Sequence, residues 1–417
     1  MRNPRQFRYV ILLAAAVSAS AQTALTWQQV KERFLANNPT LRAGEIGIQE
    51  SRAEEITANL RPNPDFSMLL DQLQPFPGTG VPYRPFTDTF PSIAFGYLHE
   101  RQHKRELRLD SARQATGIAE SQQFDLVRNM NFSLRAAFVA TLQSKALLAL
   151  AKSDLEYFDR EIGINRERFR AGDIAQVDFN RLVLQRVQFE SDYQSALVGL
   201  RTAKITLLML LDDRTPVDRF DIVGPFEFAD VPQTLEEIHD MALASRPDLR
   251  AAKQAVTKAL TDHKLAVANG SADPTFGMDF ARNPPIPVYI GFSIDIPLRI
   301  FDRNQGEKAR TELDIHRAEK TRDAAEAQVF NDVDSAYYTV ESSLSLLKPY
   351  RDVYLKTATE VRDTMSYAYE HGQAALVDYL DAQRDYRATQ VAYIGLVGSY
   401  LTAAGQLNLA AGREVIP

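Results

Sequence analysis

The sequence predicts an internally duplicated α+β fold in which two pairs of short strands are each joined to very long helices. Three observations predict it. Short motifs recur in the same order in both halves, two pairs of segments alternate in polarity, and long proline-free stretches carry apolar residues at helical spacing. Recurring motifs in register indicate repeated structural units, so we interpret the chain as two copies of one unit.

Three motifs of the first half return in the second half. The pairs are ANNPTLRAGE at 36–45 and ASRPDLRAAK at 244–253, PDFSM at 64–68 and PTFGM at 274–278, and AGDIAQVDFNRL at 171–182 and HGQAALVDYLDA at 371–382. Their offsets of 208, 210 and 200 residues are nearly equal. We therefore predict a signal peptide at 1–21, a first repeat at 22–212, a linker at 213–232 and a second repeat at 233–417.

The N-terminal segment has the pattern of a secretory signal. Arg2, Arg5 and Arg8 precede a short apolar run, and small residues follow it. This run is far shorter than the ~20 residues that span a bilayer. Its removal leaves 45 basic and 54 acidic residues, a net charge of −9, which argues against nucleic acid as a partner.

Composition narrows the possible classes further. The chain has no cysteine, which excludes disulfides, thiolate metal sites, a cysteine nucleophile and lipid attachment at an N-terminal cysteine. After residue 21 no run approaches 18 consecutive apolar residues, so we expect no transmembrane helix. An exported chain of this kind is either soluble or embedded in a membrane as a β-barrel.

Each half is expected to begin with a helix and to continue with two strands. The helices run from Thr26 to about Asn59 and from Leu235 to about Ala268, and prolines interrupt both at matching places. Alternating apolar residues then mark four strands, at Phe66, Met68 and Leu70, at Ile93, Phe95 and Tyr97, at Phe276, Met278 and Phe280, and at Ile290, Phe292, Ile294 and Ile296.

Long helical hairpins follow the strands. The stretch from Lys104 to Arg170 has no proline and would form on the order of 100 Å of helix. Apolar residues step by threes and fours along it and along its counterpart, which indicates coiled-coil seams. The seam residues are Val127, Met130, Leu134, Phe138 and Leu142, and Val329, Val333, Ala336, Val340, Leu344 and Leu347. Returning helices are expected after Gly172 and Gly372.

The four strands have about the length needed to cross an outer membrane. Four strands leave two open edges, which hydrocarbon does not tolerate, and the smallest closed membrane barrels have eight strands. Three chains would supply twelve strands, so we expect the chain to form its barrel as an oligomer.

The duplicated halves, the strand pairs, the glycines at the hairpin tips and the segment YEHGQAALVDYLDA at 369–382 together resemble the TolC family of outer-membrane efflux channels. The stretch GFSIDIPLRIFDRNQG at 291–306 resembles its heavy-metal and drug efflux branch. The resemblance implies a homotrimer in the outer membrane of a Gram-negative-type bacterium. It also implies a twelve-stranded barrel continued by a periplasmic helical tunnel, which exports small molecules or metal ions with a periplasmic adaptor (membrane fusion) protein and an inner-membrane pump.

The resemblance also assigns roles to the two tips. The adaptor-docking residues would be Ala171, Gly172, Asp173 and Ile174 with His371, Gly372, Gln373 and Ala374. Asp378 and Asp381 share a helix face and would ring the closed tunnel mouth, while Tyr369 matches a tyrosine that holds the mouth shut. Ala374 replaces the arginine that accompanies this tyrosine in some members. The alternative is that these aspartates are ordinary acids at a helix start, for which Asp178 is the control.

Other site classes receive little support. Among six histidines, only His99 and His103 have a spacing that could place two imidazoles on one helix face, and no third ligand is near in sequence. There is no phosphate loop, nucleophile elbow or zinc-protease motif, so we expect no enzyme activity, catalytic residue, cofactor or metal. The alternatives to a channel are a soluble periplasmic coiled-coil scaffold and a periplasmic metal-binding protein.

Overall fold

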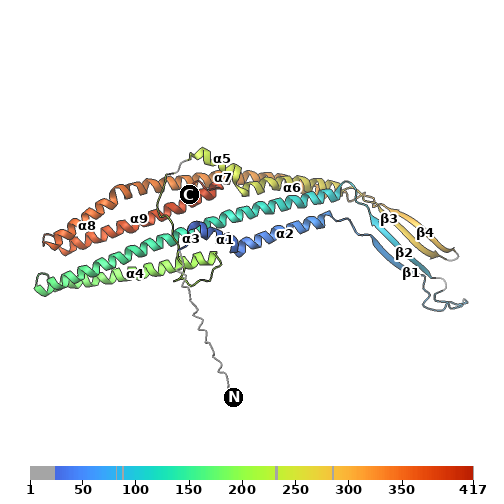
Figure 1. Ribbon diagram of the computed structural model, residues 1–417. Coiled ribbons are helices and arrows are strands. Elements are labelled where there is room, and N and C mark those ends of the chain that lie inside the picture. The colour runs from blue at the N-terminus through green and yellow to red at the C-terminus, as the bar shows by residue number, and fades with distance from the viewer. Residues whose placement is uncertain (1–23, 81, 87–88, 231–232, 284–285, 417) are drawn as a thin grey trace, which may run out of the picture. The chain divides into compact units, whose positions relative to one another are not determined.

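The computed structural model describes residues 24–80, 82–86, 89–230, 233–283 and 286–416, so the predicted signal peptide at 1–21 lies outside the described residues. The elements follow in this order: α1 (Trp27–Asn37), α2 (Pro39–Asn59), β1 (Asp65–Asp71), β2 (Phe90–Leu98), α3 (Lys104–Ala171), α4 (Gln176–Leu210), α5 (Leu235–Ser245), α6 (Pro247–Asn269), β3 (Thr275–Asn283), β4 (Ile286–Asp295), α7 (Gln305–Pro349), the π-helix η1 (Tyr350–Tyr354), α8 (Leu355–Glu370) and α9 (Leu376–Ala411). Two helices, two strands and a long helical hairpin therefore occur in each half (Figure 1).

Packing divides the chain differently from its repeats. The described residues from 24 to Phe34 form one compact unit with Ala140–Pro225. The second compact unit contains Leu35–Val139 and Phe226–Pro417. Each unit thus combines segments that are distant in sequence, and helix α3 belongs partly to each.

The first unit contains a helical hairpin made by the C-terminal part of α3 and by α4. Phe158 and Phe189 join the two helices, with ring centroids 4.7 Å apart. The segment after α4 returns to the start of the chain, where Leu25 and Ile222 form a parallel bridge. Both of these residues are buried, so the bridge joins two buried segments of the unit.

The core of the second unit is a seam along α7 and α9. All six apolar residues predicted for the α7 seam are buried, and they form one cluster with α9 residues such as Val397, Leu401 and Leu407. The corresponding seam on α3 is confirmed for Leu134, Phe138 and Leu142, whereas Val127 and Met130 are half-buried. Most of the seam residues that helical spacing predicts are therefore buried.

The predicted helix interruptions at Pro39 and Pro247 are confirmed, and each proline is the first residue of a new helix. This position suits proline because the first helical N–H has no partner within the helix. Asn38 caps α2 by accepting hydrogen bonds from the backbone N–H groups of Thr40 and Leu41. Pro349 behaves differently, since the chain continues from it directly into η1.

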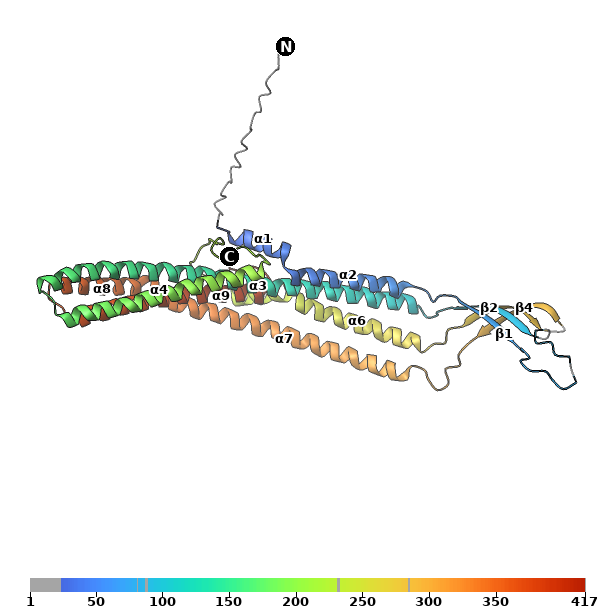
Figure 2. The same ribbon diagram turned by 90° about the horizontal axis from the view of Figure 1, so that it is seen from below.

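The strands form one antiparallel sheet in the order β1-β2-β3-β4. All four predicted strands are present, although β4 ends at Asp295, one residue before the predicted Ile296. The two strands of each half therefore pair with each other, and β2 joins β3 across the two halves. Figure 2 shows the four strands running from the ends of the helices.

Candidate functional site

One face of the sheet carries large apolar side chains that are exposed. The strand register places Phe66, Phe95, Met278 and Phe292 in one row across the four strands. The neighbouring row contains Met68, Ile93, Phe280 and Ile290. Exposure of these eight side chains ranges from 37% for Ile93 to 82% for Phe292. A continuous apolar surface of this kind is typical of the lipid-facing side of a membrane barrel.

The opposite face carries mostly small and polar residues, with Leu69 and Tyr289 as exceptions in a row nearer the hairpin loops. Ser67, Ala94, Asp279 and Gly291 form one row, and Asp65, Gly96, Gly277 and Ser293 form the next. Its glycines lie close to polar side chains, because a Cβ atom at Gly291 would lie 2.3 Å from an oxygen of Asp279. The sheet is therefore amphipathic, with one face suited to lipid and the other to water.

The sheet is open within a single chain. In the described residues, β1 pairs only with β2, and β4 pairs only with β3. Each outer strand thus has a backbone edge without a strand partner, which is unfavourable where no water is available.

The two hairpin tips have the same backbone structure. Gly172 has a φ of 84° and Gly372 a φ of 73°, in the left-handed region where only glycine has no Cβ penalty. The N–H of Gly372 donates to the carbonyl of Tyr369 at 3.1 Å, and that of Gln373 donates to Ala368 at 2.8 Å. The equivalent bonds of Gly172 and Asp173 are 3.1 Å and 2.9 Å long. Both tips thus end the ascending helix with a Schellman motif.

An aromatic pair closes each hairpin just behind its tip. Phe169 stacks on Phe179 with ring centroids 5.4 Å apart, and Tyr369 stacks on Tyr379 at 5.0 Å. Tyr369 is only 6% exposed, so its ring packs inside its own hairpin. The repeated motifs at 171–182 and 371–382 place Phe179 and Tyr379 at equivalent positions, but they do not predict this pairing. An aromatic residue three positions before each tip glycine was the available signal.

The predicted gate acids lie on the exposed side of α9. Asp378 and Asp381 are exposed, whereas Tyr379 between them and Leu376 before them are buried. Asp381 lies 3.3 Å from Arg384, a neighbour that the sequence motifs do not predict. The control residue Asp178 is half-buried and lies 3.7 Å from Arg181. The two tips therefore differ in how their acids are presented.

The predicted docking residues are mostly accessible. Ala171, Gly172, Asp173, His371, Gly372 and Gln373 are exposed, while Ile174 and Ala374 are half-buried. His371 is held against Tyr367, with its Nδ1 atom 2.8 Å from the Tyr367 carbonyl. Each tip is consequently an ordered turn with outward-facing side chains.

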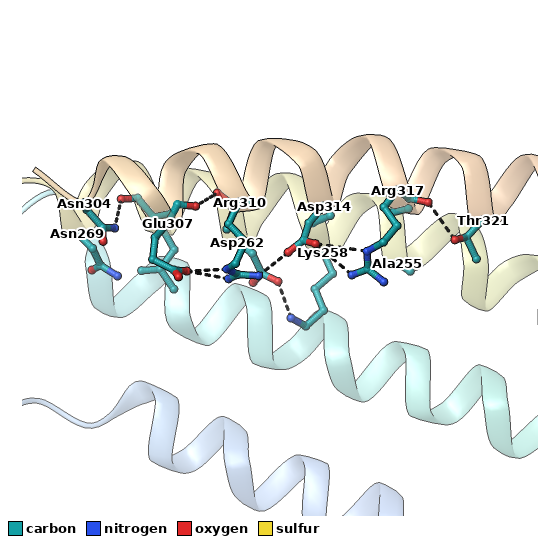
Figure 3. A pocket seen from close by; sticks show the side chains of 15 residues that line it. Ala255, Lys258, Asp262, Asn269, Asn304, Glu307, Arg310, Asp314, Arg317 and Thr321 are labelled. Carbon is teal, nitrogen blue, oxygen red and sulfur yellow. Dashed lines mark hydrogen bonds and ion pairs between the residues drawn. The ribbon is translucent and has the colours of Figure 1, made fainter.

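A groove of about 530 Å³ lies between α6 and α7 (Figure 3). Its charged side chains pair with one another. Arg310 contacts Glu307 at 2.8 Å and Asp314 at 2.5 Å, and Lys258 contacts Asp262 at 2.7 Å. Each of these ion pairs connects successive turns of one helix, α7 for Arg310 and α6 for Lys258, so the charged side chains that line the groove are already partnered.

The histidines do not form a metal centre in the described part of the chain, where no three His, Asp or Glu side chains are placed to hold an ion. His99 and His103 do not share a helix face, because α3 begins only at Lys104.

By length and composition, α3 could cross a membrane. An 18-residue stretch within it has a mean hydropathy of 1.3, and 33% of that stretch is buried. The lack of long apolar runs in the sequence predicts no such helix. Core helices of soluble proteins have the same length and composition, so this property alone does not indicate a membrane span.

Comparison with known proteins agrees with this architecture. Residues 286–413 match the family described as "Outer membrane efflux protein". The chain is 22% identical to the cobalt-zinc-cadmium resistance protein CzcC of Cupriavidus metallidurans, over 98% of this chain and 92% of that protein. A Pseudomonas aeruginosa membrane protein has the same fold, with a TM-score of 0.78, 19% identity and coverage of 93% and 90% of the two chains. The Campylobacter jejuni CmeC outer membrane channel also shares it, with a TM-score of 0.75, 14% identity and coverage of 92% and 85%.

Proposed function

We propose that this chain, which belongs to the TolC family of outer membrane efflux proteins, is the outer-membrane duct of a tripartite efflux system. The observation that carries the proposal is the amphipathic, open sheet. Three copies would supply twelve strands, close both edges, direct the apolar rows to lipid and place the small and polar rows around a lumen.

The helical hairpins supply the periplasmic part of the proposed duct. Their tips carry exposed side chains on ordered turns, which suits end-on docking to a periplasmic adaptor. The exposed pair Asp378 and Asp381 would bring six carboxylates to the mouth of a trimer, attracting cations and repelling anions. The duct has no catalytic step of its own, and the inner-membrane pump would provide the energy for export.

A soluble scaffold accounts less well for the sheet. In water, the two apolar rows would leave eight large side chains exposed, which is unfavourable for a soluble monomer. A periplasmic metal-binding protein would need a cluster of ligands, and the described residues contain none.

The mass and conductance of the purified protein test the proposal. In mild detergent we expect a trimer, and after reconstitution in a planar bilayer we expect ion-conducting channels. A folded monomer or dimer that produces no conductance would refute the duct and would favour the scaffold.

A further inference from the structure

The apolar stripe of β4 continues beyond the end of the strand. Every second side chain from Ile286 to Ile300 is large, apolar and at least half exposed, although β4 ends at Asp295. The stripe consists of Ile286, Val288, Ile290, Phe292, Ile294, Ile296, Leu298 and Ile300. Phe301 follows and is 91% exposed. The proposed barrel explains the strand portion of the stripe but not its continuation.

The dimensions of a membrane barrel show which part of the apolar stripe lies inside the membrane and which part lies at its edge. Antiparallel strands rise about 3.4 Å per residue, and barrel strands tilt by roughly 40°, so the segment from Ile286 to Ile296 covers about 26 Å along the membrane normal. The apolar band of such barrels is about 25 Å tall. Leu298, Ile300 and Phe301 therefore fall at the edge of the band, on the side where the chain continues into α7 (Figure 2).

The segment 296–304, here called the rim loop, has a defined structure. The side-chain amide of Asn304 donates to the carbonyl of Ala266 at 2.7 Å, which ties the loop to α6. A Cβ atom at Gly270 would lie 2.8 Å from the backbone oxygen of Arg303, so the loop packs closely on the end of α6. The side chain of Gln305 also donates to the carbonyl of Phe301 at 3.2 Å. The exposed apolar side chains are thus presented by an ordered loop.

Two arginines accompany these apolar side chains. Arg299 and Arg303 are both exposed, and the Nε atom of Arg303 donates to the carbonyl of Arg299 at 3.2 Å. Arg299 lies 3.8 Å from Asp302, and no carboxylate among the described residues forms an ion pair with Arg303. Apolar residues beside arginines suit the boundary between acyl chains and anionic headgroups.

We propose that the rim loop binds the periplasmic leaflet of the outer membrane. Leu298, Ile300 and Phe301 insert near the glycerol region, and Arg299 and Arg303 bind the phosphate of an anionic phospholipid. This inference rests on the proposed function, because it requires the strands to cross the outer membrane. The rim loop lies within the segment 291–306, whose sequence resembles the heavy-metal and drug efflux branch.

Depth-dependent fluorescence quenching tests the insertion of the loop. Trp27 is the only tryptophan, so Trp27→Phe provides a background without this fluorophore. In that background Phe301→Trp reports on the loop, Phe292→Trp reports on the apolar face of the sheet, and Phe124→Trp reports on an exposed position of α3. Each trimer is reconstituted in vesicles whose phospholipids are brominated either near the glycerol or near the chain ends.

The three reporters distinguish the possible outcomes. We expect Trp at 301 to be quenched most by bromine near the glycerol, Trp at 292 to be quenched by deep bromine, and Trp at 124 by neither. Quenching at 292 without quenching at 301 would overturn the rim-loop proposal and leave the duct intact. If neither position is quenched, membrane insertion itself fails, and both proposals fall.

Lipid retention tests the arginines. The double variant Arg299→Gln, Arg303→Gln should retain phosphatidylglycerol roughly 25-fold less well, at about fivefold per basic residue near an anionic surface. Native mass spectrometry of trimers equilibrated with phosphatidylglycerol and phosphatidylcholine measures this retention. The control Arg317→Gln, Arg322→Gln removes two charges from α7 and should retain the lipid like the wild type. Equal retention in both double variants, whether high or low, would overturn specific headgroup binding by the rim loop.

Discussion

Replacing Gly372 with alanine should loosen the second hairpin tip by an amount that the backbone alone determines. Gly372 has a φ of 73°, and no atom lies within 4 Å of the position that a Cβ would occupy. The substitution therefore introduces no steric clash with neighbouring groups. Its cost is that of holding an L-residue in the left-handed region, about 1–2 kcal/mol.

This cost should appear in the opening of the tip rather than in global unfolding. The N–H groups of Gly372 and Gln373 are protected by bonds to Tyr369 and Ala368, which must break before exchange. A cost of 1–2 kcal/mol raises the population of the opened tip roughly 5- to 30-fold. Hydrogen–deuterium exchange measured on peptides that cover the tip should accelerate by the same factor.

Gly163→Ala is a matched control for which we expect hydrogen exchange to slow rather than accelerate. It lies within α3, and a Cβ there would also meet no atom within 4 Å. Alanine is favoured over glycine inside a helix by about 1 kcal/mol, so Gly163→Ala should slow local exchange. Unchanged exchange at the tip in Gly372→Ala would refute the reasoning, because the left-handed glycine would then not be what holds the turn.

Two further predictions concern the gate acids and the core. The double variant Asp378→Asn, Asp381→Asn should abolish cation preference and block by trivalent cations in planar bilayers. The reason is that a trimer loses six charges, which interact by roughly 1 kcal/mol per close pair in water. Retained block would place the gate elsewhere, and Asp178→Asn is the control. Arg246→Met should lower the free energy of unfolding by about 3 kcal/mol at neutral pH, because its 3% exposed side chain pairs with Asp248 and Asp332. Burial raises the pKa of Asp248, but the hydrogen bond and positive charge of Arg246, the charge of Arg128 and the Leu249 N–H together hold that pKa below its ordinary value. The difference from wild type in acid-titrated unfolding should therefore shrink below about pH 4, where the carboxylate becomes protonated, and a constant difference would contradict the assignment.

Local sequence patterns predicted the elements well because each depends on short-range physics. The strands follow from alternation, as at Phe66 and Met68, and the helix breaks follow from the fixed φ and missing N–H of Pro39 and Pro247. The tip glycines were evident because they recur 200 residues apart and have a conformational role that other residues do not fill. The end of β4 was placed one residue too late, since Ile296 continues the alternation although the sheet hydrogen bonds have ended.

Contacts between distant residues could not be predicted in the same way. The recurring aromatic residue before each tip glycine draws attention to Tyr369, but its pairing with Tyr379 depends on how two helices meet, which residue spacing alone does not give. Arg246 resembled any arginine before a helix, yet it bridges to Asp332 on α7 across 86 positions of the sequence. The apolar character of part of α3 was also missed, because it lies in the average over a window rather than in an unbroken run.

The π-helix between α7 and α8 has a consequence for how this hairpin tolerates changes in length. Leu355 donates its N–H to the carbonyl of Tyr350, five residues back, and the inward-facing seam moves eight residues from Leu347 to Leu355 instead of seven. Deleting one residue from 350–354 would convert the π-turn to regular α-helix and restore the step of seven residues, so everything beyond it would keep its facing. Deleting one residue from α8 instead would rotate everything beyond the deletion by about 100° and turn Tyr369 away from Tyr379. This arm of the hairpin can therefore lose one residue at the π-turn without turning its tip, and it has no such reserve along α8.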